Sequence, residues 1–230
     1  MLTQKLQTSP AMLDLNFHLT TPRLLISHLN PASDAHCDFV HELFFNTNIV
    51  QELPPGELEK AKSVAPREMG RNFIADSVEK MEKTGYGRYL ISVKPIASPE
   101  ASSLQESEVT FSQRRLEPIG VVSMQYERFP SAPTIPDVGF GLLPRYHGKG
   151  YATEAAEHLM KYFEEEKGLK QICAFCKPDN EGSKAVLKRL KFDERGSREV
   201  DGVVEGEKLK VLVWTRGVQW EQGALEQYGL

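Results

Sequence analysis

The sequence predicts a mixed α/β fold (α+β) in which helices flank a single central sheet of mainly antiparallel strands. Short apolar runs bounded by Gly or Pro alternate with longer stretches whose apolar residues recur at helical spacing. The last two predicted strands are joined through turns at Gly202 and Gly206, as in an antiparallel pair. A chain of 230 residues without internal repeats suits one domain with embellishments.

The first half of the chain contains two predicted strands and two predicted helices. In order, we expect a mobile lead-in at residues 1–15, a strand at 23–27, a helix at 34–45, a loop at 52–66, a helix at 67–83 and a strand at 88–94. Ser33 or Asp34 is the expected cap of the first helix, and Gly85 ends the second. Residues 95–114 are rich in Ser and Glu and contain two prolines, which predicts a flexible insert.

The second half begins with a strand at 118–126 and a stiff, proline-containing connection. Next come a strand at 137–143, helices at 149–166 and 183–190 with a strand at 171–176 between them, and strands at 192–200 and 208–214. Ala155, Leu159 and Phe163 form part of the apolar stripe of the longer helix, and Gly168 ends it. Residues 219–230 remain as a C-terminal tail.

Composition is that of an ordinary soluble globular protein, with 40% hydrophobic and 26% charged residues. The net charge of −4 and the pI near 5.9 give no argument for a nucleic-acid partner. No apolar run approaches the roughly 20 residues of a membrane span, and no signal-peptide core is present near the N-terminus. We therefore expect no membrane association and a monomer or a homodimer.

The three cysteines raise the question of a metal or redox site. Cys173 and Cys176 form a C-x-x-C, but no second C-x-x-C or H-x-x-x-H supplies the other ligands of a zinc site. The pair also lies in a predicted strand, where residues i and i+3 point to opposite faces. We interpret both as buried apolar side chains and predict no metal. Reduced thiols fit a cytoplasmic protein, or a nuclear one.

Residues 137–154 carry most of the functional information. An apolar strand leads through the turn Arg145-Tyr146-His147-Gly148-Lys149-Gly150 into a helix. Backbone N–H groups of such a turn and of the first helical turn lack internal partners and form an anion site. A Walker A loop is excluded because its first Gly is missing and Gly150 follows Lys149. A dinucleotide fingerprint fails because position 153 is Thr.

The arrangement of Arg145, Gly148 and Gly150 resembles the Arg/Gln-x-x-Gly-x-Gly/Ala pattern of the GNAT superfamily of acyl-CoA N-acyltransferases. The similarity is greatest to the branch with the ribosomal-protein N-terminal (Rim-type) acetyltransferases. Residues 177–192 resemble the family's downstream N-x-x-S segment, and residues 21–26 resemble the opening strand of the branch. These features imply one GNAT domain over residues 16–218.

The resemblance implies acetyl-CoA as co-substrate and an amine acceptor, either a protein N-terminus or a small molecule. Backbone amides of the turn would hold the pyrophosphate, the pantetheine would pair with the strand at 139–142, and Asn180 would bond the pantetheine amide. Asn180 and Ser183 are also suited to cap the following helix. The implied CoA-binding residues are Phe140, Gly141, Leu142, Arg145, Gly148, Lys149, Gly150, Tyr151, Ala152, Asn180 and Ser183.

The expected reaction is direct attack of a neutral primary amine on the thioester. By resemblance, Asp137 is the candidate catalytic base, directly or through water, although a carboxylate at a strand end is also typical of a plain surface group. Ser183 is the candidate acid for the leaving thiolate. Two departures from the family are Leu187, where many members have the acidic Tyr, and Lys191, where the family has Gly.

Two alternatives to an enzyme remain open. The first is a non-catalytic acyl-CoA-binding or regulatory module, which the missing Tyr favours. The second is an interaction protein that uses the insert at 95–114. For an enzyme, the acceptor site would be built by residues 45–70, residues 126–136 and the terminal hairpin.

Overall fold

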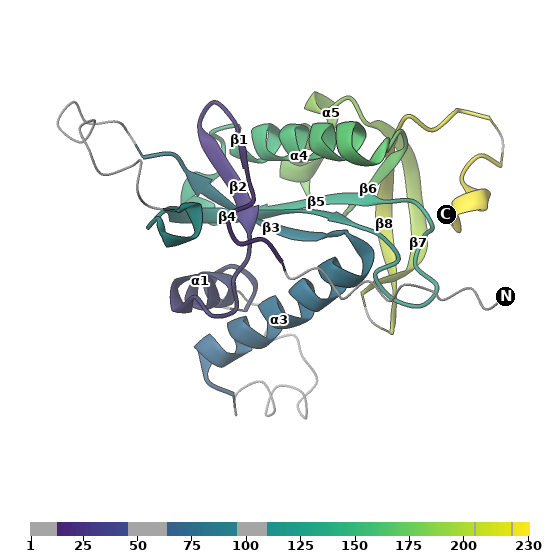
Figure 1. The fold of residues 1–230 in the computed structure, drawn as a ribbon. Helices are drawn as coiled ribbons and strands as arrows, with labels where there is room; N and C mark the ends of the chain where they lie inside the picture. The colour runs from purple at the N-terminus through teal and green to yellow at the C-terminus, as the bar shows by residue number, and fades with distance from the viewer. Residues whose placement is uncertain (1–12, 46–63, 96–109, 205, 222) are drawn as a thin grey trace, which may run out of the picture.

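An eight-stranded sheet forms the middle layer of the molecule (Figure 1). The structure is a computed structural model and describes residues 13–45, 64–95, 110–204, 206–221 and 223–230. The strand order is β1-β2-β3-β4-β5-β6-β8-β7, and only β5 and β6 pair in parallel. The strands are β1 (His18–Thr20), β2 (Leu24–His28), β3 (Gly87–Val93), β4 (Glu117–Gln125), β5 (Asp137–Leu142), β6 (Ile172–Cys176), β7 (Asp193–Val204) and β8 (Glu207–Arg216). The predicted single, mostly antiparallel sheet is confirmed.

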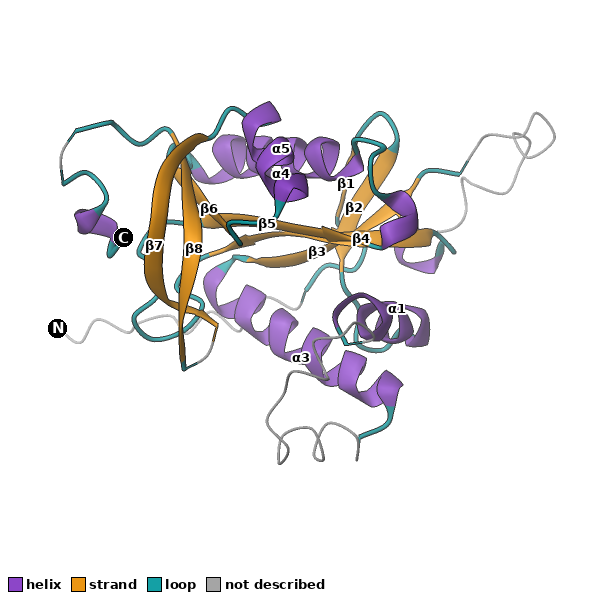
Figure 2. Cartoon of the chain, turned by 180° about the vertical axis from the view of Figure 1, so that it is seen from behind, coloured by secondary structure: helices purple, strands orange, loops and turns teal. Residues whose placement is uncertain are grey.

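Helices cover both faces of the sheet (Figure 2). The α-helices described are α1 (Asp34–Phe44), α3 (Pro66–Thr84), α4 (Tyr151–Lys167) and α5 (Glu181–Arg189), with short 3-10 helices η2 (Phe111–Gln113), η3 (Pro144–Tyr146) and η4 (Glu226–Tyr228). Helices α1 and α3 lie on one face, and α4 and α5 lie on the other. No helix among the described residues is long and apolar enough to cross a membrane.

The alternation of side chains along each strand divides the core into two layers. Ile26 and Ile91 pack with Phe163 on the α4 side of the sheet, and all three are fully buried. Leu90 and Val121 pack with α1 and α3 on the other side. Side chains alternate between the two faces, so consecutive residues of β3 lie in different core layers. Because both faces of β3 are buried, its sequence is a continuous apolar run.

Helix boundaries follow the predicted signals with one correction. Ser33 caps α1 by accepting the His36 N–H at 3.4 Å, and Gly85 ends α3 with φ of 71°. The prediction that α5 begins at Ser183 was wrong by two residues. Asn180 is its cap, because its Oδ1 accepts the Ser183 N–H at 2.9 Å. Both Asn and Ser are favourable N-cap residues, so the sequence alone did not distinguish Asn180 from Ser183 as the start of α5.

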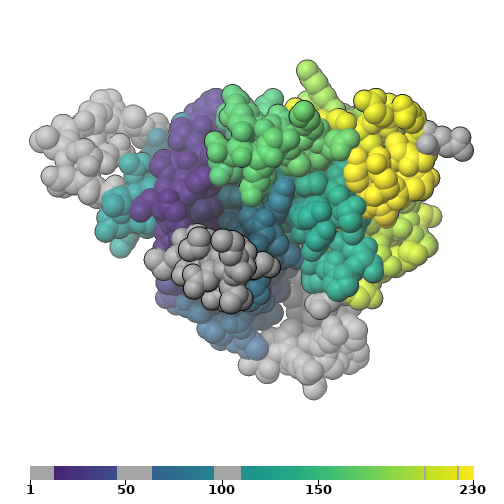
Figure 3. All heavy atoms as spheres, turned by 45° about the vertical axis from the view of Figure 1, so that its right-hand side comes forward, coloured from purple at the N-terminus to yellow at the C-terminus, as the bar shows by residue number. Residues whose placement is uncertain are grey.

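Four segments expected to lack regular structure lie partly among the described residues. Most of the predicted loop at 52–66 and of the expected acceptor segment at 45–70 lies outside the described part, which lacks 46–63. Of the predicted insert at 95–114, residues 96–109 lie outside the described part, but 111–113 form η2 and Phe111 stacks on His18 of β1. Of the lead-in, residues 1–12 lie outside it. The C-terminal residues pack against the sheet, where buried Leu225 joins Ile135 and Cys173. Figure 3 shows these residues (yellow) beside the segment after β4 (teal).

Lys191, which stands where the family has Gly, occupies the left-handed backbone region. Its φ is 60°, and it forms the C′ position of a Schellman motif: the Phe192 N–H donates to the Leu187 carbonyl at 3.0 Å and the Lys191 N–H donates to the Lys188 carbonyl at 3.1 Å.

A non-Gly residue in this region is strained by about 1–2 kcal/mol. We therefore expect Lys191→Gly to raise the free energy of unfolding by about 1 kcal/mol in urea denaturation. Lys191→Ala removes the same charge but keeps a Cβ. It serves as the control, and an equal gain in that variant would contradict the backbone explanation.

Candidate active site

The parallel strands β5 and β6 separate immediately after they meet. Their pairing consists of one register pair, Asp137 with Cys173, and the Cys173 N–H donates to the Pro136 carbonyl at 2.9 Å. Beyond this point β5 continues to pair with β4, and β6 continues to pair with β8. Among the described residues the carboxyl halves of β5 and β6 therefore have no register pair with each other, and we call this break in the sheet the groove.

Backbone groups of β5 line one side of this groove. The Leu143 N–H donates to the Ile119 carbonyl at 3.0 Å, so odd-numbered residues of this stretch face β4. Alternate residues of a strand present their amides to opposite sides, so the backbone of Val138, Phe140 and Leu142 faces β6. The His147 Nε2–H donates to the Leu142 carbonyl at 2.8 Å, so this carbonyl already has a partner. The Val138 N–H belongs to the Asp137–Cys173 pairing, so the backbone groups of Phe140 are the ones placed like those of an exposed sheet edge.

The turn after β5 is shaped by two glycines. Gly148 has φ of 73° and Gly150 has φ of 79°. A Cβ at position 148 would meet no atom within 4 Å, so there is open space beside this residue. Gly150 is the N-cap of α4 and offers no side-chain cap, which leaves the N–H groups of the first helical turn available. This backbone conformation is compatible with the anion site, which stays a prediction.

The glycines within β5 differ from one another. A Cβ at Gly141 would meet nothing within 4 Å, whereas a Cβ at Gly139 would meet Ser123 Oγ at 2.8 Å. Of these two glycines, only Gly141 therefore has open space where a side chain would lie. Gly139 instead permits close packing of β5 on β4.

An ion pair between Arg23 and Glu154, which the sequence analysis did not predict, holds the turn that contains Lys149. Arg23 donates from Nη1 to the Lys149 carbonyl at 2.9 Å and from Nε to Glu154 Oε2 at 2.7 Å. Thr21 Oγ1 also donates to Glu154 Oε1 at 2.6 Å. Burial by itself raises the pKa of Glu154, but the hydrogen bonds from Thr21 and Arg23 outweigh it and lower that pKa. The only sequence signal was one Glu in the first turn of the helix.

Replacing this carboxylate is expected to loosen the turn. The side chain of Glu154 is 11% exposed and that of Arg23 is 48% exposed, so we expect Glu154→Gln to reduce the free energy of unfolding by about 1–2 kcal/mol at pH 7. Since the folded-state pKa is lowered, the difference from wild type persists above about pH 4.5 and shrinks as the pH falls through the folded value.

Urea denaturation at pH 7 and at acid pH measures this dependence. Glu157→Gln, an exposed change one turn along α4, is the control. A difference between wild type and Glu154→Gln that does not change with pH would contradict the ionic explanation.

The remaining side chains of the turn point to neighbouring elements. Arg145 pairs with Glu42 of α1 at 2.8 Å, and this hydrogen bond raises the pKa of Arg145. Lys149 Nζ lies 5.2 Å from the centre of the Tyr146 ring. Tyr151 and Ala152 begin α4 and are half-buried. An anion at this turn would therefore be bound mainly by backbone amides, with Lys149 as a nearby cation.

Asn180 and Ser183 lie on the opposite flank of the groove. They follow the carboxyl end of β6, as the glycine turn follows the carboxyl end of β5. Because parallel strands end at the same edge of a sheet, the fold brings both segments to the same opening. The Asn180 Oδ1 is used by the cap of α5, which leaves its Nδ2 as a donor.

Asp137 lies at the point where the strands separate, and it is 4% exposed. Arg128 Nε donates to its Oδ2 at 2.9 Å, and Arg128 Nη2 binds its Oδ1. The alternative of an exposed strand-end carboxylate is excluded by this burial. Action as a base would require the Arg128 pair to open, and no sequence pattern pointed to Arg128.

Two further cations surround this ion pair. Arg88 lies over the Phe73 ring at 4.9 Å, and burial lowers its pKa to about 10, helped by the charge of Arg128 and opposed by that of Asp137. Burial also lowers the pKa of Lys80, whose Nζ binds the Arg128 carbonyl. The carboxylate of Asp137 is thus the counter-ion for a cluster of buried positive charge.

Cys173 and Cys176 point into different cores, as predicted, and both are free and buried. Burial raises the pKa of the Cys173 thiol. Among the described residues no cluster of His, Cys, Asp or Glu could hold a metal ion. Leu187, at the position of the family Tyr, is 1% exposed in the core.

A groove with an exposed strand edge, followed by a cradle of free amides, can bind an extended ligand that ends in phosphate. The edge pairs with amide groups of the ligand, as in strand addition, and the cradle holds the anion. The open space at Gly141 and Gly148 suits such a ligand. Fold and site together are those of an acyl-CoA-dependent acetyltransferase.

Comparison with known proteins places the chain in a family. Residues 23–193 match the acetyltransferase (GNAT) domain family, so the chain belongs to it, and the predicted resemblance is confirmed. A segment of 60 residues is 37% identical to the uncharacterized N-acetyltransferase YnaD of Bacillus subtilis (strain 168). That segment covers 26% of this chain and 35% of YnaD, so the match spans about a third of the relative's length.

Solved structures share the fold at low sequence identity. The ribosomal L7/L12 α-N-protein acetyltransferase RimL in complex with coenzyme A has a TM-score of 0.55 at 20% identity, covering 85% of this chain and 94% of that one. The microcin C7 self-immunity acetyltransferase MccE, in complex with acetyl-CoA and AMP, has a TM-score of 0.59 at 15% identity, covering 85% and 92%. At 15–20% sequence identity, these structures show that the fold is shared and nothing more.

Proposed function

We propose that this protein transfers an acetyl group from acetyl-CoA to a primary amine, either a protein N-terminus or a small-molecule amine. The observation that carries the proposal is the groove between β5 and β6 that ends in the Gly148–Gly150 cradle. Membership of the GNAT family and the CoA complexes of its structural neighbours support it.

In this proposal the pantetheine arm pairs with the backbone of Phe140, and the amides from Arg145 to Tyr151 hold the pyrophosphate. The Nδ2 of Asn180 donates to a pantetheine carbonyl. The amine nitrogen then attacks the thioester carbon, the C–S bond breaks, and the thiolate takes up a proton. In this proposal the Phe140 N–H, which faces the groove, stabilises the oxyanion.

The protonation state of the acceptor determines how much help it needs. An α-amine has a pKa of about 8, and a lysine side chain has one of about 10.4. At pH 7 deprotonation costs roughly 1.4 kcal/mol for the former and 4.6 kcal/mol for the latter. Since Asp137 is engaged by Arg128, a weakly basic amine is the acceptor that this site favours. Asp137 remains our candidate base through a bound water.

Ser183 is the proposed acid for the leaving thiolate. Its contribution to the α5 cap is its backbone N–H, which an Ala residue retains. We therefore expect Ser183→Ala to lower kcat about 10- to 100-fold without changing the melting temperature or the KM for acetyl-CoA. Asn180→Ala is the comparison, because it removes the cap and is expected to raise that KM. An unchanged kcat in Ser183→Ala would remove Ser183 from the chemistry.

Release of free thiol from acetyl-CoA tests the function. The acceptors are peptides with a free α-amine, the same peptides with that amine blocked and a lysine present, and polyamines. Thiol release that depends on the amine establishes the transferase, and the acceptor that is used defines the class. Absence of release with every amine would refute the proposal.

A second candidate is a non-catalytic acyl-CoA-binding or regulatory module. Two observations favour it: Leu187 replaces the family Tyr and is buried, and Asp137 is held in an ion pair. Saturable CoA binding in calorimetry together with no release across the amine panel is the result expected for this candidate.

A further inference from the structure

A second pocket lies on the other face of the sheet from α4. Its volume is about 570 Å³, within the range of small-molecule sites. It is bounded by β2 and β3, by the first turn of α1, and by residues 111–116. The last segment crosses the α1 face of the sheet, because Phe111 stacks on His18, which pairs with Ser27 of this same face.

A buried polar atom on the floor of this pocket has no partner. Ser92 is 1% exposed and lines the pocket, and its Oγ forms no hydrogen bond with any described residue. Leu25 lies opposite Ser92 in the β2–β3 ladder and Ser27 lies opposite Leu90, so Ser27, another buried hydroxyl, is a diagonal neighbour of Ser92 on the same face. A buried hydroxyl without a partner costs about 1–3 kcal/mol, which a bound ligand with an acceptor or donor would recover.

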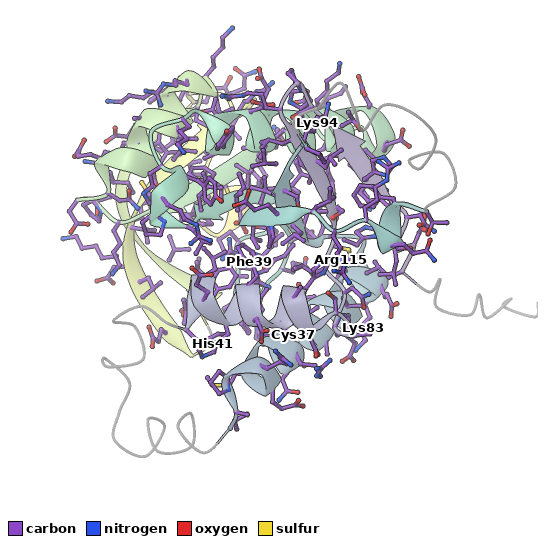
Figure 4. All side chains as sticks on the ribbon, turned by 90° about the vertical axis from the view of Figure 1, so that its left-hand side faces the viewer. Cys37, Phe39, His41, Lys83, Lys94 and Arg115 are labelled. Atoms are coloured by element: carbon purple, nitrogen blue, oxygen red, sulfur yellow. The ribbon has the colours of Figure 1, made fainter. Side chains whose placement is uncertain are left out.

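The walls of the pocket favour an anion. Arg114 and Arg115 stand at its rim, and no acidic side chain is among the described residues that line it. Figure 4 shows Arg115 on the side of the sheet that α1 covers. The first turn of α1, with its positive dipole end, contributes Ser33 and His36.

His36 adds a defined donor. Its Nδ1 accepts the Asn30 N–H at 3.0 Å, and burial lowers its pKa, so the neutral ring carries its proton on Nε2.

The pocket is separate from the groove assigned to CoA. Ser92 and Leu90 share the face that packs against α1, whereas the glycine turn leads into α4 on the opposite face. β4 also lies between β3 and β5 in the sheet. None of the residues implied for CoA binding lines the pocket.

We propose that this pocket is a second binding site of the protein, for a small organic anion whose carboxylate or phosphate group is held by Arg114, Arg115 and the amino end of α1, with Ser92 on its floor. The site is independent of acetyl transfer and is suited to an accessory or regulatory ligand.

The test is an NMR titration of the ¹⁵N-labelled protein, saturated with CoA so that the phosphate turn is occupied. Inorganic phosphate and citrate are the two probes. The expected result is saturable shifts of amides in residues 27–36, 90–92 and 111–116 with at least one probe. A response to phosphate alone indicates a phosphoryl ligand, and a response to citrate alone indicates a carboxylate. No saturable shift in these residues with either probe overturns the proposal.

Two variants locate the binding. Arg114→Gln/Arg115→Gln is expected to weaken the affinity for the active probe by at least about tenfold. Its control is Lys208→Gln/Lys210→Gln, which makes the same charge change at exposed positions of β8. Ser92→Val is expected to weaken binding while leaving the melting temperature of the ligand-free protein unchanged or higher, since it removes an unpartnered hydroxyl. Unaltered affinity in both pocket variants also overturns the proposal.

Discussion

Asp137→Asn is expected to reduce the free energy of unfolding by about 3–5 kcal/mol. The Asp137 and Arg128 side chains are 6% and 18% exposed, so the substitution leaves a buried guanidinium without its counter-ion. Arg88 and Lys80 lie in the same cluster and add like-charge repulsion. Urea denaturation followed by circular dichroism measures the loss. Asp193→Asn, at an exposed position of β7, is the control.

The double variant Asp137→Asn/Arg128→Gln separates the structural role of the carboxylate from a chemical one. The double variant is expected to lose less free energy of unfolding than the two single variants together, by at least about 1–2 kcal/mol. If Asp137 is also the base, the folded double variant stays about 100-fold or more below wild type in kcat. Recovery of both stability and kcat would assign Asp137 a structural role alone. A loss below about 1 kcal/mol in Asp137→Asn would contradict the ion-pair account.

Gly148→Ala is expected to weaken CoA binding about 100-fold, which corresponds to about 2.7 kcal/mol. The new Cβ would occupy the open space beside the turn whose backbone amides are proposed to hold the pyrophosphate. In the free protein it meets no atom within 4 Å, so the change costs only the strain of the left-handed region, about 1–2 kcal/mol. Isothermal titration calorimetry with CoA measures the affinity.

Gly196→Ala is a matched control for this variant. Gly196 lies in β7, has φ of 85°, and also has nothing within 4 Å of a built Cβ. The control is expected to lose similar stability and to bind CoA as wild type does. Equal CoA affinity in both variants would show that the turn does not hold the ligand.

Most of the helices and strands and the glycine turn could be predicted from the sequence, whereas the short strand β1 was not predicted. Local signals were sufficient there: the apolar periodicity defined α4, Gly85 ended α3, and Gly148 and Gly150 marked a turn that only glycine adopts without strain. Lys191 was recognised as an unusual residue at a glycine position for the same reason, since backbone conformation is a local property.

The tertiary structure decided which distant residues meet. Arg23 reaches Lys149 and Glu154 over more than 120 positions, and Arg128 takes both oxygens of Asp137. The separation of β5 from β6 and the second pocket at Ser92 likewise depend on how strands pair across the sheet. Charge pairing and burial arise from long-range packing, and no local pattern in the chain encodes which partner a charged or buried polar side chain will find.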